Sequence, residues 1–444
     1  MTIRDYIDKN LEAILNDLSD LVSFKSVLSD DEKPFGSENR KALDYMLNKM
    51  KDSGFNTKNL DYYAGYGEIG SGEKLIGLLA HLDVVPVSDG WLSDPFKMDI
   101  RNNYCYGRGV SDDKGAAIAS YHALKYLKEI NYPLNKRVRL VLGCNEENGS
   151  KCLEYYVAKE GHIDYGFTPD GNFPGIYAEK GMYQAIINFK GTKILAIKGG
   201  EARNIVCPKV SISFSDLAFD LTLFKKYLDD NSLKYEINDK EITVYGTAAH
   251  ASLPHLGKNA IAYLMKALEI AGFDDDFVRF FNKYFGLDYN GKGLNIALVD
   301  DYGDLTLNIG LIEQKDNIIS FSIDIRFPIS FKYDVIVTAF EKLNSDNVRV
   351  DLKHTENPLF FDPNSPMLKA LHSAYQKVTN DYESKMEVIG GGTYAKGINN
   401  CIAFGCAFKD EDNHIHDSNE ELSIESLKKQ IEIYAQAIMN LNKL

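Results

Sequence analysis

Apolar side chains in the first part of the chain follow helical and strand-like patterns in turn. One helical face is predicted between residues 7 and 22, where apolar residues recur every three or four positions: Ile7, Leu11, Ile14, Leu15, Leu18, Leu21 and Val22. Lys74–Ala80 and Arg137–Gly143 are short apolar runs that indicate buried strands, and Gly115–Lys128 has the pattern of a helix. This alternation, which continues to about residue 183, predicts an α/β domain.

The pattern changes between about residue 184 and residue 358. Short strands alternate with helices there, and glycine and aspartate interrupt the chain more often. After this segment an apolar strand is predicted near Cys401–Ala407 and a closing helix from about Ser423 to Leu441. We therefore predict a discontinuous α/β domain formed by residues 1–183 and 359–444, with a second, α+β domain inserted at residues 184–358.

The composition limits the classes of protein to which the chain can belong. Its 444 residues are too many for one ordinary core, which agrees with two or three domains. The net charge of −14 would repel nucleic-acid backbones and anionic membranes. Six irregularly spaced cysteines without a CxxC pair fit buried thiols better than disulfides or a thiolate metal site. No apolar stretch could cross a bilayer and no secretory leader is evident, so a cytoplasmic protein is expected.

Histidine and carboxylate residues follow several of the predicted strands. In chain order they are His81-Leu82-Asp83, the run from Gly107 to Gly115 with Asp112 and Asp113, the pair Glu146-Glu147, Asp170 and His416. Imidazole nitrogens and carboxylate oxygens together are ligands for divalent ions such as zinc, manganese or cobalt. Several carboxylates in one cleft would repel one another, and two divalent cations would neutralise most of that charge. The set therefore predicts the centre of a two-metal hydrolase.

Each of these motifs also has an ordinary structural explanation. His81 and Asp83 could form an ion pair at a strand end. Asp112 and Asp113 lie in a glycine-rich turn before a helix, where they could act as its N-cap. His414 and His416 alternate along a presumed strand, so composition does not choose between them. The whole set of motifs is therefore stronger evidence for a two-metal centre than any single motif is.

The ordered motifs resemble those of the co-catalytic zinc peptidases, the family that includes carboxypeptidase G, aminoacylase and the dipeptidase V group. The likeness extends over nearly the whole chain and is nearest to the dipeptidase V group. It rests on these runs: His81-Leu82-Asp83-Val84-Val85-Pro86, Gly90-Trp91, Asp94-Pro95-Phe96, Gly107 to Gly115, Glu146-Glu147, Asp170, Glu179-Lys180-Gly181, and His416 with Asn419-Glu420. The resemblance implies a mixed-sheet α/β zinc-peptidase catalytic domain with an inserted α+β lid domain.

The resemblance also implies that two divalent metal ions bind to the catalytic domain. Zinc is expected first, with manganese or cobalt as alternatives. The implied ligands are one pair for each ion and one shared carboxylate: His81 with Asp170, Glu147 with His416, and Asp112 as the bridge. The resemblance selects His416 rather than His414 as the metal ligand, because the spacing between His416 and Glu420 matches the family motif.

Two carboxylates are implied to act beside the metals. Glu146 would be the general base, and Asp83 would orient the imidazole of His81. The family further implies a cis peptide bond between Asp112 and Asp113, which is rare without proline.

The inserted segment carries the residues that the resemblance assigns to substrate binding. His250 is similar to the lid histidine that polarises the scissile carbonyl, and Arg326 to the arginine that clamps a substrate carboxylate. Asn204 resembles a second contact from the lid. A backbone cradle near the substrate terminus is implied in the glycine run after Ile389, at Gly391, Gly392 and Thr393. Without the family, Arg326 would be interpreted as a strand ion pair with Asp324.

The inserted segment is long for a lid, although its length is normal for a domain. Smaller lids of the family pair between two subunits, whereas a large lid resembles the dipeptidase V arrangement, in which one chain completes its own site. We therefore expect a monomeric dipeptidase with a small peptide substrate and no nucleic-acid or membrane partner. The alternatives are an N-acyl amino acid deacylase, or a tripeptidase or carboxypeptidase. A metal-binding protein without catalysis is disfavoured, because Glu146 and His250 are both present.

Overall fold

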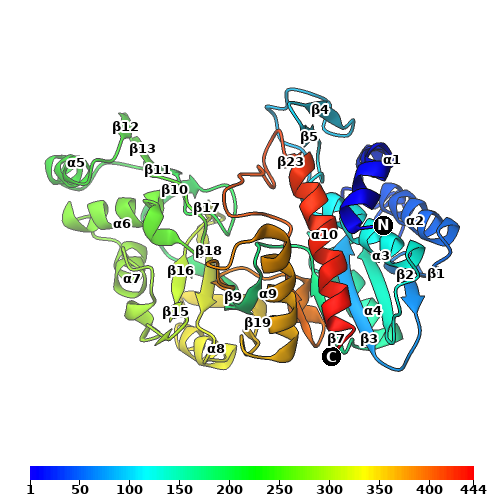
Figure 1. The fold of residues 1–444 in the computed structure, drawn as a ribbon. Helices are drawn as coiled ribbons and strands as arrows, with labels where there is room; N and C mark the ends of the chain where they lie inside the picture. The colour runs from blue at the N-terminus through cyan, green and yellow to red at the C-terminus, as the bar shows by residue number, and fades with distance from the viewer. The chain divides into compact units, whose positions relative to one another are not determined.

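The chain, described over residues 1–444 by a computed structural model, forms two compact units. Unit 1 contains residues 1–178, 361–387 and 392–444, and unit 2 contains residues 179–360 and 388–391. Figure 1 shows unit 1 mainly in blue, cyan, orange and red, and unit 2 mainly in green and yellow. Each unit has its own sheet and its own helices.

Unit 1 is built on a mixed sheet. Strands β6, β3, β7 and β22 run parallel, and antiparallel strands flank them. In spatial order the strands are β1 (Asn56–Leu60), β2 (Ala64–Gly70), β6 (Arg137–Gly143), β3 (Leu75–His81), β7 (Tyr165–Thr168), β22 (Cys401–Ala403) and β8 (Ile176–Glu179). β3 is buried over its whole length, as is usual for a parallel strand that is covered on both faces. The mixed sheet with its helices confirms the predicted α/β class.

Helices cover both faces of this sheet. Met50 of α2 lies against Gly67 of β2, where a Cβ atom would come within 2.4 Å of the methionine sulfur. The neighbouring residue Tyr66 points to the opposite face, where its ring meets Tyr156 of α4 edge-on. α3 is buried almost all round and contacts α1 and α10. The α-helices are α1 (Ile3–Ser23), α2 (Ser37–Asp52), α3 (Lys114–Glu129), α4 (Lys151–Glu160), α9 (Pro366–Thr379) and α10 (Ile424–Leu441).

A small sheet and a short helical turn complete unit 1. The small sheet has the order β23 (Glu421–Ser423), β5 (Tyr104–Tyr106) and β4 (Asp99–Arg101). The turn η3 (Tyr394–Gly397) is capped by Thr393, whose side chain accepts a hydrogen bond from the N–H of Ala395. β20 (Leu359–Phe360) and β21 (Glu387–Ile389) are short strands near the points where the chain passes from one unit to the other.

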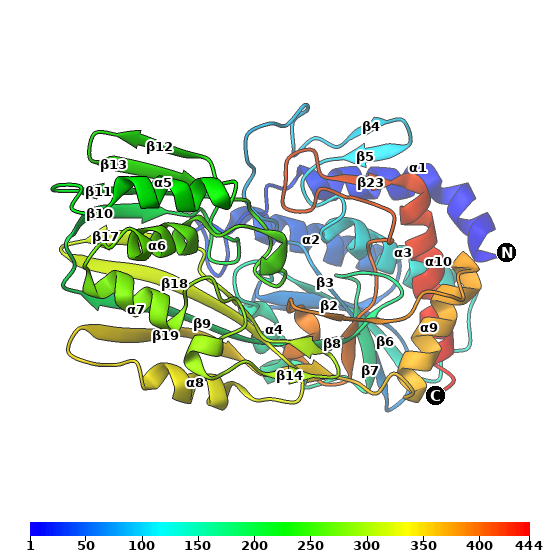
Figure 2. The same cartoon turned by 90° about the vertical axis from the view of Figure 1, so that its left-hand side faces the viewer.

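Unit 2 is built on an antiparallel sheet. Its order is β12 (Tyr235–Asn238), β13 (Glu241–Tyr245), β11 (Lys209–Phe214), β10 (Ile194–Gly199), β17 (Ile312–Lys315), β18 (Ile318–Phe327), β9 (Gly181–Lys190) and β19 (Val348–Glu356), with β16 (Thr306–Asn308) beside β18. The helices are α5 (Leu221–Asp230), α6 (Ala260–Ile270), α7 (Asp276–Tyr284) and α8 (Tyr333–Glu341), and β14 (Val299–Asp300) pairs with β15 (Gly303–Asp304). Figure 2 shows α6 and α7 lying across one face of this sheet.

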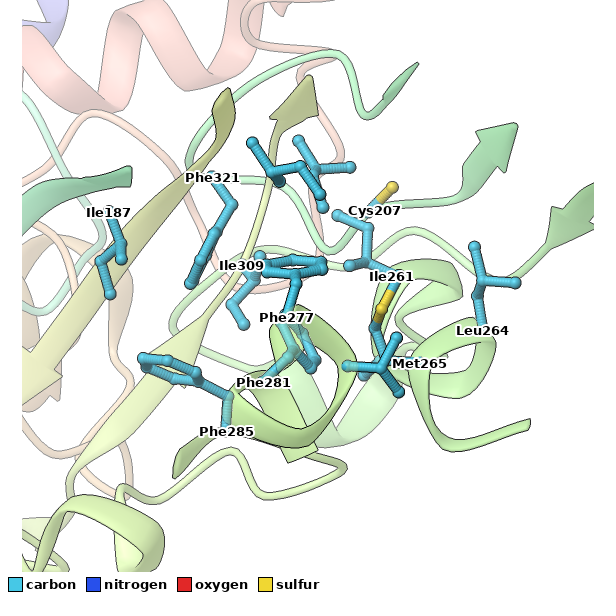
Figure 3. Close-up of a cluster of buried hydrophobic side chains, with 14 of the residues drawn as sticks. Ile187, Cys207, Ile261, Leu264, Met265, Phe277, Phe281, Phe285, Ile309 and Phe321 are labelled. Carbon is cyan, nitrogen blue, oxygen red and sulfur yellow. The ribbon is translucent and has the colours of Figure 1, made fainter. Parts of the chain in front are cut away.

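The core of unit 2 is rich in phenylalanine. Phe277 and Phe281 of α7 project from the helix toward Phe321 of β18, and all three side chains are buried (Figure 3). Along β9 buried residues alternate with partly exposed ones, which is the pattern of a strand with one face on a core. The segment predicted as inserted, residues 184–358, lies within unit 2.

Two local predictions were wrong. The strand near Cys401–Ala407 ends at Ala403, because Gly405 has a left-handed φ of 78° that a strand does not accommodate. His414 and His416 do not lie on a strand, since their φ values of 50° and 65° place both in left-handed turn conformations. None of the helices is long and apolar enough to span a bilayer.

Candidate metal centre

Three neighbouring strands of unit 1 end beside one another and present candidate ligands. β6, β3 and β7 are adjacent and parallel, so their carboxyl ends lie at the same edge of the sheet. His81 is the last residue of β3, Glu146 and Glu147 follow β6, and Asp170 follows β7. The strand order therefore brings together residues that are far apart in the sequence.

Asp112 reaches the same edge from the turn that precedes α3. Asp113 occupies the N-cap position of α3 but makes no capping hydrogen bond with its side chain, so the capping explanation of this turn is wrong. Its Oδ2 instead accepts a hydrogen bond of 3.0 Å from the main-chain N–H of His81. The Asp112–Asp113 peptide bond is cis, which confirms the bond that the resemblance implied.

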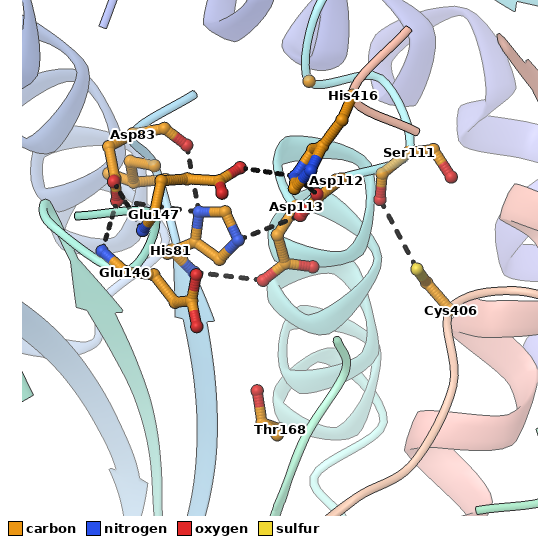
Figure 4. Close-up of polar contacts among 12 residues, drawn as sticks. His81, Asp83, Ser111, Asp112, Asp113, Glu146, Glu147, Thr168, Cys406 and His416 are labelled. Carbon is orange, nitrogen blue, oxygen red and sulfur yellow. Dashed lines mark hydrogen bonds and ion pairs between the residues drawn. The ribbon is translucent and has the colours of Figure 1, made fainter. Parts of the chain in front are cut away.

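The carboxylate of Asp112 lies between two imidazoles (Figure 4). Nε2 of His81 is 3.0 Å from Oδ1 of Asp112, and Nε2 of His416 is 2.9 Å from Oδ2. The same nitrogen of His416 lies 3.1 Å from Oε1 of Glu147. His414 does not join them, because its nearest acidic neighbour is Asp412, with 3.9 Å between Nδ1 and Oδ1. Each oxygen of Asp112 thus faces a different histidine.

Asp170 and Glu146 complete the cluster. Ligand atoms of His81, Asp112 and Glu147 all lie within 4.8 Å of one another, and the same is true of His81, Glu146 and Asp170. Imidazole nitrogens and carboxylate oxygens at this spacing form a donor set that suits zinc, manganese or cobalt.

Asp83 contacts His81 through its main chain as well as its side chain. Nδ1 of His81 hydrogen-bonds the carbonyl oxygen of Asp83 at 2.9 Å, whereas the carboxylate oxygen Oδ1 lies 3.6 Å away. The carboxylate accepts hydrogen bonds from the N–H groups of Glu146 at 2.9 Å and Glu147 at 3.1 Å. A backbone carbonyl can fix the tautomer of a ligating histidine as a carboxylate does. Asp83 therefore holds both the imidazole of His81 and the turn that carries Glu146 and Glu147.

Burial and mutual repulsion perturb the acidic groups of the cluster. Burial, followed by repulsion from Asp170, raises the pKa of Glu146 well above its ordinary value. Burial, followed by repulsion from Asp112, raises the pKa of Asp170 to about 7. Hydrogen bonds to Asp112 and Glu147 raise the pKa of His416 to about 10. The cluster by itself thus carries an excess of negative charge, and some of its groups retain protons. Divalent cations fit this donor set in place of those protons.

A carboxylate to which the sequence analysis gave no role holds the turn that carries Asp112. Glu420 is fully buried and follows His416 by four residues. Its two oxygens accept four hydrogen bonds of 2.8–3.0 Å, from the N–H groups of Gly109, Ser111 and Asp112 and from Nη1 of Arg108. No local pattern could have revealed these contacts, because Glu420 and Asp112 are 308 positions apart.

Replacing Glu420 with glutamine is expected to lower the free energy of unfolding by about 3 kcal/mol, because it breaks a buried ion pair with Arg108 and removes an acceptor. Urea denaturation measures this loss. The matched control is Glu425→Gln, which removes the exposed ion pair with Arg4 and should cost less than about 1 kcal/mol. Equal losses for the two variants would contradict the role of Glu420.

Tyr394 was also missed from the sequence. Its ring meets the imidazole of His81 edge-on, with 6.1 Å between the ring centroids and an angle of 84°. Its hydroxyl lies 2.8 Å from Sγ of Cys152, and a Cβ atom at Gly143 would come within 2.0 Å of it. Tyr394 thus packs against His81 in a space that only a glycine at position 143 leaves open.

The substrate-contact candidates His250 and Asn204 lie on adjoining segments of unit 2. The N–H of Ala251 donates to the carbonyl oxygen of Asn204 at 2.8 Å, so the two loops are joined beside His250. The main-chain N–H of Ser252 donates to Nδ1 of His250 at 3.3 Å, and the hydroxyl oxygen of Ser252 lies 2.7 Å from the same nitrogen. Burial, followed by the positive charge of Arg326, lowers the pKa of His250. A neutral ring whose Nδ1 accepts a hydrogen bond carries its proton on Nε2.

Arg326 forms the expected strand ion pair with Asp324, and some of its N–H groups remain without a partner. Its Nε and Nη2 donate to Asp324 at 2.6 and 3.3 Å, and its Nη1 donates to the carbonyl oxygen of Gly390 at 2.8 Å. Because a guanidinium has five N–H groups, two remain, one on Nη1 and one on Nη2. Gly390 and Gly391 belong to unit 2, whereas Gly392 and Thr393 belong to unit 1.

The fold and the acidic, histidine-containing cluster define a candidate metallohydrolase, and comparisons with known proteins give the family. The sequence profile of the Peptidase family M20/M25/M40 matches residues 77–440. A Staphylococcus aureus (strain USA300) protein with the name "Putative dipeptidase" is 33% identical over 99% of both chains. The structure of human carnosine dipeptidase 1 is similar with a TM-score of 0.65 and 17% identity over 100% of this chain and 98% of that one. The structure of Dug1p of Saccharomyces cerevisiae, described as a dipeptidase, is similar with a TM-score of 0.62 and 17% identity, over 100% of this chain and 98% of that one.

The chain belongs to the M20/M25/M40 peptidase family. It is therefore a hydrolase of the peptidase class, as the ordered motifs implied.

Proposed function

We propose that this peptidase is a dinuclear metal-dependent dipeptidase that hydrolyses L-dipeptides with a free C-terminal carboxylate. The observation that carries the proposal is the position of Asp112, whose two carboxylate oxygens face His81 and His416 at 3.0 and 2.9 Å. The names of the Staphylococcus aureus relative and of the carnosine dipeptidase and Dug1p structures support a dipeptide as the substrate.

In this proposal five side chains of unit 1 hold two divalent cations. His81 and Asp170 bind one, Glu147 and His416 bind the other, and Asp112 is shared between them. Zinc is the first candidate, and manganese and cobalt accept the same donors. When bound, the cations supply Lewis acidity, which polarises the scissile carbonyl and makes a water molecule more acidic.

Glu146 acts as the general base on the attacking water. Its carboxylate accepts no hydrogen bond from another protein group, while its own N–H is held by Asp83 at 2.9 Å. The side chain is thus positioned by the turn and available to receive a proton, which it passes to the leaving amine. His250 stabilises the oxyanion by donating from Nε2, the nitrogen that carries the proton when Nδ1 accepts from Ser252.

Arg326 binds the C-terminal carboxylate of the substrate with its two remaining N–H groups, and Asn204, Gly391, Gly392 and Thr393 supply further contacts. Arg326→Lys is expected to raise the KM for a dipeptide about 100-fold with a smaller effect on kcat, because lysine is a point charge without a bidentate fork. Steady-state kinetics measure the split. A dipeptide amide, which lacks the carboxylate, should be hydrolysed equally by both proteins.

The matched control for Arg326 is Arg349→Lys, an exposed arginine of the same unit that pairs with Asp351. Its KM should equal that of the unchanged protein. If Arg326→Lys raised KM equally for the dipeptide and its amide, the carboxylate clamp would be rejected.

A substrate panel tests the proposed activity as a whole. Dipeptides are expected to be hydrolysed at least about tenfold more efficiently than tripeptides or N-acyl amino acids, since a fixed carboxylate clamp limits substrate length. Preference for N-acyl amino acids would favour a deacylase, and preference for longer peptides a tripeptidase or carboxypeptidase.

We further propose a monomer in which His250 serves the site of its own chain. Elution as a dimer in size-exclusion chromatography at assay concentration would contradict it.

A further inference from the structure

The loop that carries His416 is closed on itself and fixed at its base. The main-chain N–H of Glu421 donates to the carbonyl oxygen of Asn413 at 3.1 Å, so residues 413–421 form a closed loop, which we call the His416 loop. Nδ2 of Asn413 donates to the hydroxyl oxygen of Ser111 at 2.9 Å. The base of the His416 loop is therefore joined to the turn that precedes α3.

The imidazole of His416 has fewer anchors than that of His81. Nε2 of His416 contacts Asp112 and Glu147, which are proposed ligands themselves (Figure 4). A histidine that binds a metal usually donates its other ring N–H to a carboxylate or a carbonyl oxygen, as Nδ1 of His81 does to Asp83. Nδ1 of His416 has no such protein partner, and the side chain is 53% exposed. The position of this imidazole therefore depends on the main chain of its loop.

Asn419 joins the outer part of the His416 loop to another segment of unit 1. Its Nδ2 donates to the carbonyl oxygen of Gly90 at 3.1 Å, and its Oδ1 accepts a hydrogen bond of 2.8 Å from the N–H of Leu92. One side chain thus holds the main chain on both sides of Trp91.

The segment that Asn419 holds is itself fixed by Trp91. The indole ring of Trp91 lies over the guanidinium of Arg108, with 5.2 Å between Cζ and the ring centroid. Arg108 is 1% exposed and pairs with Glu420 at 2.9 Å. A cation is attracted to the face of an aromatic ring, and the attraction is stronger where water is excluded. Residues 90–92 are therefore a fixed partner for the amide of Asn419.

We propose that Asn419 is a positioning residue that places His416 and thereby sets the affinity for the cation assigned to Glu147 and His416. This inference rests on the proposed dinuclear centre, and Asn419 is not itself a ligand. Apart from the contacts of the imidazole, the outer part of the His416 loop otherwise has only local hydrogen bonds, such as the one from the N–H of Asp417 to the carbonyl oxygen of His414 at 3.0 Å. Without the Asn419 amide, a cation must order the loop when it binds, which costs conformational entropy and weakens binding.

Isothermal titration calorimetry of the metal-free full chain with zinc chloride tests this proposal through binding alone. Asn419→Gly removes the amide and keeps the left-handed φ of 61°, which glycine adopts without strain. The unchanged protein should bind two zinc ions per chain, and the variant should bind one of them about 10- to 100-fold more weakly. The matched control is Asn400→Gly, at another left-handed asparagine, whose amide donates to the carbonyl oxygen of Ile163 at 2.9 Å. This control should leave both affinities unchanged.

A double-mutant cycle separates positioning of His416 from a general effect on the fold. In a His416→Ala background the imidazole is absent, so adding Asn419→Gly should leave the affinity for the remaining zinc ion unchanged. Equal weakening by Asn419→Gly with and without His416, or no weakening at all, would overturn the positioning role and leave the dinuclear centre intact. Failure of the unchanged protein to bind two zinc ions would reject the dinuclear centre, and this inference with it.

Trp91 gives a second readout that needs no metal. It is the only tryptophan of the chain, so the intrinsic tryptophan fluorescence reports on residues 90–92. Asn419→Gly should make Trp91 easier to quench with acrylamide, because the main chain on both sides of the ring is released. Gly90→Ala should raise the quenching and weaken the same zinc ion, since its φ of 99° disfavours a side chain and its Cβ atom would lie 3.2 Å from Oγ of Ser418. Unchanged quenching and zinc affinity in Gly90→Ala would overturn the proposal even if Asn419→Gly failed to fold.

Discussion

Replacing Glu146 with glutamine is expected to lower kcat for dipeptide hydrolysis by about 10³- to 10⁴-fold while the protein retains its metal. The physical reason is that glutamine has the size of glutamate but cannot accept the proton of the attacking water. In the structure the N–H of Glu146 is held by Asp83. The ligands that the resemblance implies are five other side chains, namely His81, Asp112, Glu147, Asp170 and His416. The substitution therefore removes the base and leaves those ligands in place.

Two measurements are needed together for this variant. Steady-state kinetics give kcat, and elemental analysis of the purified protein gives the number of metal ions per chain. Glu154→Gln is the matched control, because Glu154 is exposed on α4 just beyond the same turn, and it should retain full activity and full metal content. Activity within about tenfold of the unchanged protein would remove Glu146 from the role of base. Loss of metal in Glu146→Gln would make it a ligand instead.

Removal of divalent metal by exhaustive chelation is expected to abolish dipeptide hydrolysis and to destabilise unit 1. A metal that binds only the folded state at a free concentration 1,000-fold above its Kd contributes about 4 kcal/mol to the free energy of unfolding. Without it, the carboxylates of Asp112, Glu147 and Asp170 lose the positive charge that offsets their repulsion. Activity should return when zinc, manganese or cobalt is added back, and the ion that restores most activity identifies the preferred metal.

The control for chelation is Asp112→Ala, which removes the shared ligand. Its thermal unfolding should be the same with and without chelator, because no pair of cations remains to be removed. Hydrolysis that persists after elemental analysis shows less than one metal ion per hundred chains would contradict a metal-dependent mechanism. An unchanged melting temperature of the original protein after chelation would contradict the stabilising role alone.

Much of the fold could be predicted because local patterns were strong. Periodic apolar residues indicated α1, α3 and α10, and short, mainly apolar runs indicated β3 and β6. These elements are buried against several neighbours, so their patterns are continuous and their ends lie close to the predicted ones. The strand after Cys401 was predicted too long, since Gly405 turns the backbone before the apolar run ends.

The candidate site could be predicted only in part, because residue type and strand order indicate which residues meet but not which of their atoms make contact. His81, Glu146 and Asp170 follow strands, and parallel strands that are adjacent in a sheet end at one edge, so their approach follows from the strand order. Asp83 was expected to act on His81 through its carboxylate, but its carbonyl oxygen makes the short contact and its carboxylate holds the glutamate turn. Which atom of a residue makes a contact depends on the local backbone path, and residue type does not reveal it.

The sequence by itself determined the class of the protein and the kinds of side chain in its site, because apolar periodicity and ordered motifs are properties of neighbouring residues. Only the tertiary structure decided that each oxygen of Asp112 faces a different histidine, that Glu420 holds the Asp112 turn, and that Tyr394 packs on His81. The last two contacts join residues more than 300 positions apart, since Glu420 and Asp112 are separated by 308 positions and Tyr394 and His81 by 394 − 81 = 313. Such pairings depend on how turns and strand ends meet in space, and no short run of residues carries that information.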